Sequence, residues 1–335
     1  MILATATAAG SIGSPLLWGL FLAGVLFVLA LDLGVFHREE HVISTREAAI
    51  WTGVWIGLSL LFNLWVYLEF GPKPGLEFLT GYVIEKALSV DNIFVFIIIF
   101  AYFGVPAKYQ HRVLFWGIFG ALVMRGVFIG LGAALVSRFA WVLYIFGAFL
   151  VLTGLKIMIQ RETEVHPERN PVVNLFRRFV PITRHYDGKR FFTRENGRLL
   201  ATPLLLVLVV VEATDVVFAV DSIPAIFGIT HDPFIVFTSN VGAILGLRAM
   251  YFLLAGMMNK FVYLKFGLGL VLTFIGAKML GVDLFHLPVQ VSLGVVVGIL
   301  GASVAASLLW PPPPDKLPKL PQGEGAPPEP EPPAG

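Results

Sequence analysis

The hydrophobic pattern of this chain consists of long apolar stretches separated by short polar connections. A transmembrane helix needs about 20 mostly apolar residues to cross the hydrocarbon core of a bilayer. Nine stretches approach this length, so the pattern predicts an all-α polytopic membrane protein with about nine transmembrane helices. The predicted spans are 15–36, 48–68, 77–103, 113–135, 140–159, 201–228, 235–257, 263–281 and 288–310.

The composition agrees with a membrane location. Hydrophobic residues make up 57% of the chain and charged residues only 14%, whereas charged residues are about 25% of soluble domains. A secretory signal peptide would carry Lys or Arg before its apolar segment. No Lys or Arg precedes the first span, so we expect this span to be a retained helix. The chain contains no cysteine, which excludes disulfide bonds and thiolate metal sites.

The basic residues are distributed unevenly between the two sets of connections. Sixteen follow odd-numbered spans, and only two, Lys73 and Arg138, follow even-numbered spans. Lysine and arginine accumulate on the cytoplasmic side of membrane proteins. We therefore expect the N-terminus to face out of the cell and the C-terminus to face the cytoplasm.

Two segments are too polar to cross the membrane. The connection 160–200 carries nine basic residues, and we expect it to be a plain cytoplasmic linker. The alternative is a short surface helix over 174–180, with Arg177 and Arg178 near anionic lipid head groups. The segment 311–335 holds half of the chain's 22 prolines, and this composition predicts a disordered tail.

An acidic motif occurs twice inside the apolar spans, with its carboxylates six residues apart in both copies. The first copy contains Glu85 and Asp91, and the second contains Asp215 and Asp221. Spans three to five therefore repeat as spans six to eight. Because three crossings are an odd number, the second copy must be inverted in the membrane. Further matches are Arg125 with Arg248, Gly147 with Gly269, Gly154 with Gly276 and Lys156 with Lys278.

The repeats divide the chain into six segments. These are two N-terminal helices (1–76), repeat 1 (77–159), the basic cytoplasmic loop (160–200), the inverted repeat 2 (201–281), a last transmembrane helix (282–310) and the Pro-rich tail (311–335). Inverted repeats are a common plan of secondary transporters, whose substrate sites lie near the middle of the membrane.

Carboxylates at bilayer depth are candidates for function, because each costs roughly several kcal/mol unless it is paired, protonated or bound to a metal. Six residues correspond to roughly 600° on an α-helix, so the two acids of one motif would point about 120° apart. We therefore expect an unwound turn between them, which would aim both at one site and release backbone carbonyls as ligands. Pro224, shortly after Asp221, supports a break there.

These acids predict a binding site for a hard divalent cation. Glu212 stands one turn before Asp215, where the first motif has Tyr82, so five carboxylates are expected to converge. Oxygen ligands of this kind suit Mg²⁺, Ca²⁺ or Mn²⁺. Asn92 and Ser222 would either complete the oxygen shell or form helix–helix hydrogen bonds, and both alternatives stay open. All seven histidines fall in predicted loops or at span ends, which excludes a histidine zinc site in the core.

Basic residues inside the spans are candidates for charge balance. Lys86, Arg125 and Arg248 would neutralise carboxylates when no cation is bound. For Lys86, static pairing or snorkelling to the head groups is an equal alternative. For the two matched arginines we favour charge balance. Lys156 and Lys278 lie near span ends, where snorkelling explains them.

The strings VIEKALSVDNIFVF and VVEATDVVFAVDSIPAIF, together with the basic central loop, closely resemble the TerC family of bacterial membrane proteins, in particular its Alx-like members. The resemblance covers about residues 15–310. It implies a place in the LysE-type transporter superfamily, a location in the bacterial cytoplasmic membrane and an association with manganese efflux and tellurium resistance. In this sequence, the acids of the family motif fall on Glu85, Asp91, Glu212, Asp215 and Asp221.

The leading hypothesis is a secondary transporter that exports Mn²⁺, in which the repeats rock around a carboxylate site and protons compete for it. Proton antiport is a natural coupling that the sequence does not establish. The alternative is a membrane interaction protein with structural acids, which assists metal loading or insertion of exported proteins through secretion-machinery or metalloprotein partners. An intramembrane aspartyl protease is disfavoured because the Gly-x-Gly-Asp setting is missing. We expect no enzymatic activity, no cofactor apart from the transported Mn²⁺, and no nucleic-acid partner.

Overall fold

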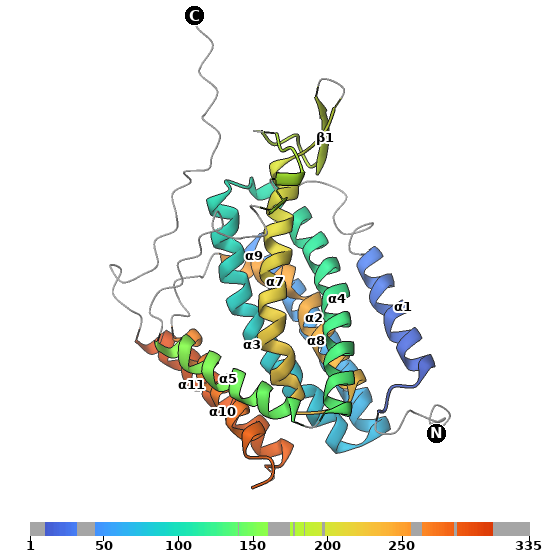
Figure 1. Ribbon diagram of the computed structural model, residues 1–335, viewed down its shortest axis with the longest axis vertical. Helices are drawn as coiled ribbons and strands as arrows, with labels where there is room; N and C mark the ends of the chain where they lie inside the picture. The colour runs from blue at the N-terminus through green and yellow to red at the C-terminus, as the bar shows by residue number, and fades with distance from the viewer. Residues whose placement is uncertain are drawn as a thin grey trace, which may run out of the picture.

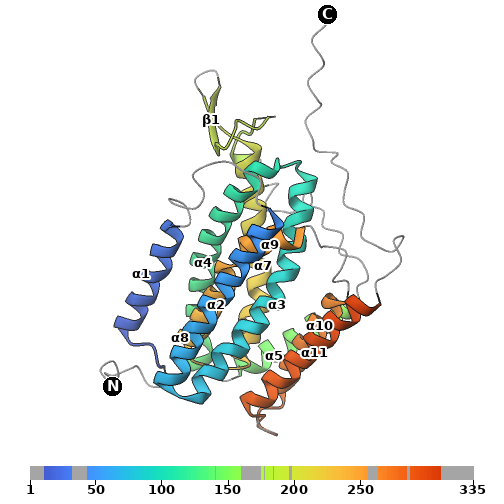
Figure 2. The same ribbon diagram turned by 180° about the vertical axis from the view of Figure 1, so that it is seen from behind.

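The computed structural model describes residues 11–31, 44–139, 141–159, 175–176, 178–183, 185–195, 198–255, 263–284 and 287–310. Within these ranges the chain is overwhelmingly α-helical (Figures 1 and 2). The predicted disordered tail lies outside the described residues. The helices are α1 (Pro15–Leu31), α2 (Thr45–Phe70), α3 (Pro72–Tyr102), α4 (Ala107–Arg138), α5 (Val142–Ile159), α7 (Pro203–Phe227), α8 (Pro233–Leu245), α9 (Leu247–Ala255), α10 (Leu264–Leu280) and α11 (Val289–Leu309).

Several of these helices can cross a membrane. Among the described residues, α2, α4, α5, α7 and α11 are long and apolar enough, and α8 with α9 adds a sixth candidate span if this pair, bent by 42°, is one span. The helices α1 and α10 have only 17 residues each, and α3 carries Glu85, Lys86 and Asp91 near its middle. The all-helical architecture is thus confirmed, and the count of nine crossings stays a prediction.

The two helices that carry the acidic motifs lie at the centre of the bundle. α3 and α7 pack against each other, α8 packs against both, and α4 packs against α7 and α8. Apolar side chains such as Phe96, Phe100 and Val207 fill the space between these helices. On the outside, helices expose large apolar side chains such as Leu61 and Leu152. An outer surface of this kind suits a lipid environment, in contrast to the buried acids of the motifs.

α5 and α10 lie side by side along one flank of the bundle, beside α11 (Figures 1 and 2). Glycines bring their backbones into contact. A Cβ added to Gly147 would lie 3.0 Å from the carbonyl oxygen of Gly276, and a Cβ added to Gly276 would lie 2.6 Å from that of Gly147. Gly154 and Gly269 face each other in the same way, with corresponding distances of 2.5 and 2.7 Å. Small residues permit such close helix packing in membranes.

The expectation of an unwound turn between the acids of each motif is wrong. α3 continues through Glu85 and Asp91, and α7 continues through Asp215 and Asp221 as far as Phe227. No glycine or proline stands between the acids, and an unwound turn would leave backbone groups without partners in the membrane. Pro224 is tolerated because it lies in the last turn of α7. The break in the helical bundle occurs instead at Gly246, between α8 and α9.

The expectation of a plain linker at 160–200 is also wrong for the described part. β1 (Phe192–Glu195) and β2 (Arg198–Ala201) form an antiparallel hairpin, seen above the helices in Figure 1. The Tyr186 hydroxyl donates a hydrogen bond of 2.8 Å to the carbonyl oxygen of Phe103 after α3, and the guanidinium of Arg112 lies 5.0 Å from the centre of the Phe191 ring. These contacts attach the connection to the turn after α3 and to the N-terminal part of α4.

Candidate functional site

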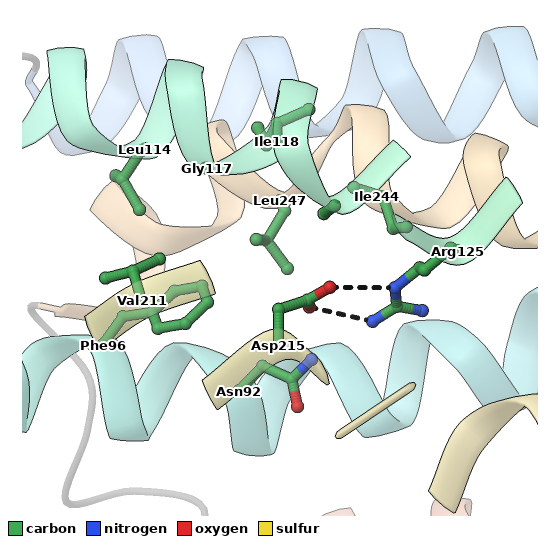
Figure 3. A pocket seen from close by; sticks show the side chains of 11 residues that line it. Asn92, Phe96, Leu114, Gly117, Ile118, Arg125, Val211, Asp215, Ile244 and Leu247 are labelled. Atoms are coloured by element: carbon green, nitrogen blue, oxygen red, sulfur yellow. Dashed lines mark hydrogen bonds and ion pairs between the residues drawn. The ribbon is translucent and has the colours of Figure 1, made fainter. Parts of the chain in front are cut away.

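Arg125 of α4 connects the two acidic motifs at the centre of the bundle. Its Nε donates to Asp215 Oδ2 at 3.2 Å and its Nη2 donates to Asp215 Oδ1 at 3.1 Å (Figure 3). Its Nη1 donates to Glu85 Oε1. The same Nη1 lies 3.2 Å from Asn240 Oδ1 and 3.4 Å from Ser222 Oγ. We call these five residues the Arg125 cluster: one arginine bridges one carboxylate from each motif.

The Arg125 cluster is buried and carries a net negative charge when both acids are ionised. Arg125 is 1% exposed, Glu85 0% and Asp215 7%. Charges interact strongly in such surroundings because the effective dielectric constant is low. Two carboxylates share one guanidinium, so one negative charge remains uncompensated within the cluster. A proton or an additional cation would neutralise it.

Some buried polar atoms around the Arg125 cluster have further bonding capacity. Within the described part of the chain, Glu85 Oε2, Ser89 Oγ and Asn240 Nδ2 are buried without a hydrogen-bond partner. Buried polar groups are almost always paired with protein or water. The two oxygens are hard donors that suit a divalent cation or a water molecule.

A small cavity adjoins the ion pair of Arg125 and Asp215 (Figure 3). Its volume is about 10 Å³, close to the space that one water molecule requires. Asn92 lies at the polar end beside Asp215, and Leu114 and Leu247 contribute to the apolar walls. A hydrated divalent ion does not fit this space, so the Arg125 cluster is closed in this conformation.

The second acid of each motif points to a different neighbour, because both helices are continuous. Asp91 lies within electrostatic range of Lys265 at the start of α10. Asp221 lies beside Thr153 and Lys156 of α5 and within electrostatic range of Asp91. We call Asp91 and Asp221 the aspartate pair; it lies toward the α5–α10 flank of the bundle.

The fifth predicted ligand, Glu212, belongs neither to the Arg125 cluster nor to the aspartate pair. Its carboxylate occupies the space that a side chain at Gly120 of α4 would fill, and it lies within electrostatic range of Asp215. Among the described residues, no three histidine, aspartate or glutamate side chains are placed to hold a metal ion together. The five acids therefore do not converge on one point in this conformation, and their role as ligands stays a prediction.

Of the three predicted charge-balancing residues, Arg125 joins the motifs, and the others contact different elements. Lys86 Nζ donates to the carbonyl oxygen of Ala243 at 3.1 Å, near the break at Gly246. An ammonium at a helix C-terminus satisfies a free carbonyl and complements the helix dipole. Arg248 Nη1 lies 3.0 Å from His111 Nε2.

The sequence pattern did not identify two polar residues of the spans. Asn240 is fully buried and joins the Arg125 cluster; its position in an otherwise apolar span, eight residues before Arg248, was the available signal. Glu77 at the start of α3 accepts a hydrogen bond of 2.7 Å from Thr230. In the same turn as Thr230, partial desolvation lowers the pKa of His231, with Lys278 and Lys73 adding to this effect.

Comparisons with known proteins agree with this architecture. The family described as "Integral membrane protein TerC family" matches residues 70–312. An uncharacterised membrane protein of Myxococcus xanthus is 56% identical over 299 residues, which cover 89% of this chain and 94% of the relative. A protein of Escherichia coli strain K12, whose description proposes a membrane-bound redox modulator, Alx, is 52% identical over 87% of this chain and 93% of its own length. No solved structure matches this chain.

Proposed function

This chain belongs to the TerC family of integral membrane proteins, and we propose that it is a secondary transporter that exports a hard divalent cation. Among these cations, Mn²⁺ is the proposed substrate. The observation that carries this proposal is the buried arginine between two carboxylates from two repeated motifs. Arg125 occupies the position between Glu85 and Asp215 that a bound cation would take. In this conformation the guanidinium of Arg125 compensates one of the two negative charges.

The chemistry of the surrounding atoms supports a hard cation as substrate. Release of Arg125 would free three carboxylate oxygens in addition to the unpartnered Glu85 Oε2, and the hydroxyl of Ser222 and the amide oxygen of Asn240 lie at the same point. Mn²⁺, Mg²⁺ and Ca²⁺ prefer such oxygen ligands. The aspartate pair would supply further carboxylates along the route of the ion.

Alternating access supplies the transport step. The reciprocal glycine contacts of α5 and α10 support two inverted repeats, which in secondary transporters rock around a site at the repeat interface. Because protons and cations compete for the same carboxylates, proton antiport is the proposed coupling. The proposed location is the bacterial cytoplasmic membrane, with the basic hairpin in the cytoplasm, the N-terminus outside and the C-terminus inside.

The description of the Alx relatives proposes a redox role, which the residues of this chain do not explain through thiol chemistry. This chain has no cysteine, so it cannot carry out thiol–disulfide exchange. The alternative of an interaction protein for metal loading or membrane insertion predicts no ion flux by the purified protein.

Reconstitution tests the proposed function. Purified protein in liposomes that contain a Mn²⁺-quenched dye is exposed to Mn²⁺, Mg²⁺, Ca²⁺ or Zn²⁺, with and without an imposed pH gradient. We expect Mn²⁺ flux that depends on the gradient and is lost in Asp91→Asn and Asp221→Asn but retained in Glu195→Gln, an acid of the hairpin. The absence of flux in the unmodified protein, or equal flux in all variants, would contradict the proposal.

A further inference from the structure

The contact of α5 with α10 has the reciprocity that a two-fold axis between inverted repeats requires. In the sequence, Gly147 matches Gly269 and Gly154 matches Gly276. Exchange of the repeats therefore converts the contact of Gly147 with Gly276 into a contact of Gly269 with Gly154. The structure contains both contacts. Matched residues are thus expected in equivalent surroundings wherever the two repeats have the same conformation.

Arg125 and Arg248 are also matched, but their surroundings differ. Arg125 binds Glu85 and Asp215, whereas Arg248, which is 7% exposed, has its Nη1 beside the His111 ring. Arg125 lies inside the uninterrupted α4, and Arg248 follows the break between α8 and α9. The repeats therefore differ in conformation at this pair of residues. A protein with inverted repeats can reach its opposite-facing state when the two repeats exchange conformations.

The cavity of the candidate site connects the Arg125 cluster with the start of α9. Arg125 and Asp215 line it, and so does Leu247, the neighbour of Arg248. Leu114, which also lines it, stands three residues after His111 on α4. Because the break at Gly246 directly precedes α9, a change of the bend there would move Arg248 relative to this cavity.

We propose that Arg248 is a second carboxylate-binding residue of the transport cycle, which replaces Arg125 between Glu85 and Asp215 in the opposite-facing state. This inference rests on the proposed transport function. Each arginine closes the site in one of the two states, and the cation binds while neither guanidinium lies between the carboxylates. The cation-free carrier can then return across the membrane without exposing unpaired buried charges.

The cysteine-free chain allows a direct test with one reporter, Val211→Cys. Val211 lines the cavity and takes no part in the Arg125 cluster. Its rate of reaction with a membrane-impermeant maleimide is measured from each face of oriented proteoliposomes, without Mn²⁺. The backgrounds are unmodified protein, Arg125→Gln, Arg248→Gln and the control Arg138→Gln at the exposed end of α4.

We expect the ratio of the inside to the outside rate to shift in opposite directions in Arg125→Gln and Arg248→Gln, each on the order of tenfold, and to stay constant in Arg138→Gln. Arg248→Lys keeps the charge but loses the planar fork, so it should shift the ratio as Arg248→Gln does, by a smaller factor. If Arg248→Gln does not fold, Arg248→Lys replaces it in the labelling comparison. Shifts in the same direction, or none in the Arg248 variants, would overturn the inference.

The test is independent of the proposed transport activity. Because no metal ion is added, opposite shifts of the reporter ratio support the exchange of arginines even in a protein that shows no Mn²⁺ flux. Conversely, Mn²⁺ flux together with an unchanged ratio of inside to outside labelling rates in the Arg248 variants would support the transport function. It would also show that Arg248 does not replace Arg125 during transport.

Discussion

Arg125 and Asp215 form a two-point ion pair across α4 and α7, at distances of 3.2 and 3.1 Å. Arg125→Gln removes the pair and leaves Glu85 and Asp215 buried without a cation. We expect this to lower the free energy of unfolding by roughly 3–5 kcal/mol. Mn²⁺ should restore part of it, because a ligand of the folded state stabilises by mass action. Thermal unfolding in detergent with and without Mn²⁺ measures both effects.

The matched control is Arg138→Gln at the exposed end of α4, where the guanidinium lies over the Phe139 ring at 6.0 Å. This change should alter stability by no more than about 0.5 kcal/mol. A similar loss in both variants, or no rescue of Arg125→Gln by Mn²⁺, would contradict the assignment of a cation site to Glu85 and Asp215.

The packing of α5 against α10 predicts that a glycine-to-alanine change at this contact lowers the stability of the protein, whereas the same change at an open position in α11 does not. Gly276→Ala would place a Cβ 2.6 Å from the carbonyl oxygen of Gly147, so the helices must separate, at a cost of about 1–3 kcal/mol. Gly298→Ala in α11 meets nothing within 4 Å and should stabilise its helix by about 0.5–1 kcal/mol. Unfolding midpoints that move in the same direction for both variants would refute this account of the helix pair.

The contact of Tyr186 with Phe103 predicts an alkaline loss of stability. Burial raises the pKa of Tyr186 from 10.0 to about 12. In the unfolded chain the phenol loses its proton at lower pH than in the folded protein, so its contribution is fully present below pH 10 and lost as pH rises through about 12. Tyr186→Phe should remove this component and the hydrogen bond, worth roughly 0.5–1.5 kcal/mol. The difference in stability between the two proteins, followed from pH 9 to 12 by unfolding in detergent, would stay constant if the contact were absent in solution.

The uneven distribution of basic residues predicts which face of the membrane each connection occupies. Single cysteines at two exposed positions test it: Arg194→Cys in the hairpin and His231→Cys in the turn between α7 and α8. Impermeant thiol reagents applied to intact spheroplasts should label His231→Cys and spare Arg194→Cys until the membrane is opened. The reverse pattern would invert the proposed direction of transport.

The sequence alone was sufficient for the helical membrane architecture and for the importance of the repeated acids, because both depend on composition and spacing. It also singled out Arg125 as a charge-balancing residue, since a lone arginine in an apolar span requires a partner. It did not predict which acids share that partner. Glu85 and Asp215 do so because α3 and α7 stay helical, which turns Asp91 and Asp221 about 120° away toward α5 and α10.

Other features depend on contacts that no local pattern reveals. Asn240 reaches Arg125 only because α8 packs across α3 and α4. The connection that carries the hairpin is held by Tyr186 against the turn after α3 and by Phe191 against Arg112 of α4. Its strands have only four residues each, which is too short for a clear hydrophobic alternation. The break at Gly246 lies between α8 and α9, where Lys86 of α3 donates to the carbonyl oxygen of Ala243, a contact between segments far apart in the sequence.

Equilibrium binding of Mn²⁺ to the purified protein tests the central claim most directly. Binding is followed by the electron paramagnetic resonance signal of free Mn²⁺ in detergent, for unmodified protein, Glu85→Gln, Asp215→Asn and the hairpin control Glu195→Gln. The account predicts saturable binding that weakens as pH falls, is retained in Glu195→Gln and is lost in Glu85→Gln and Asp215→Asn, because ligand carboxylates must be deprotonated. Undiminished Mn²⁺ binding in Glu85→Gln and Asp215→Asn, in correctly folded protein, would contradict it.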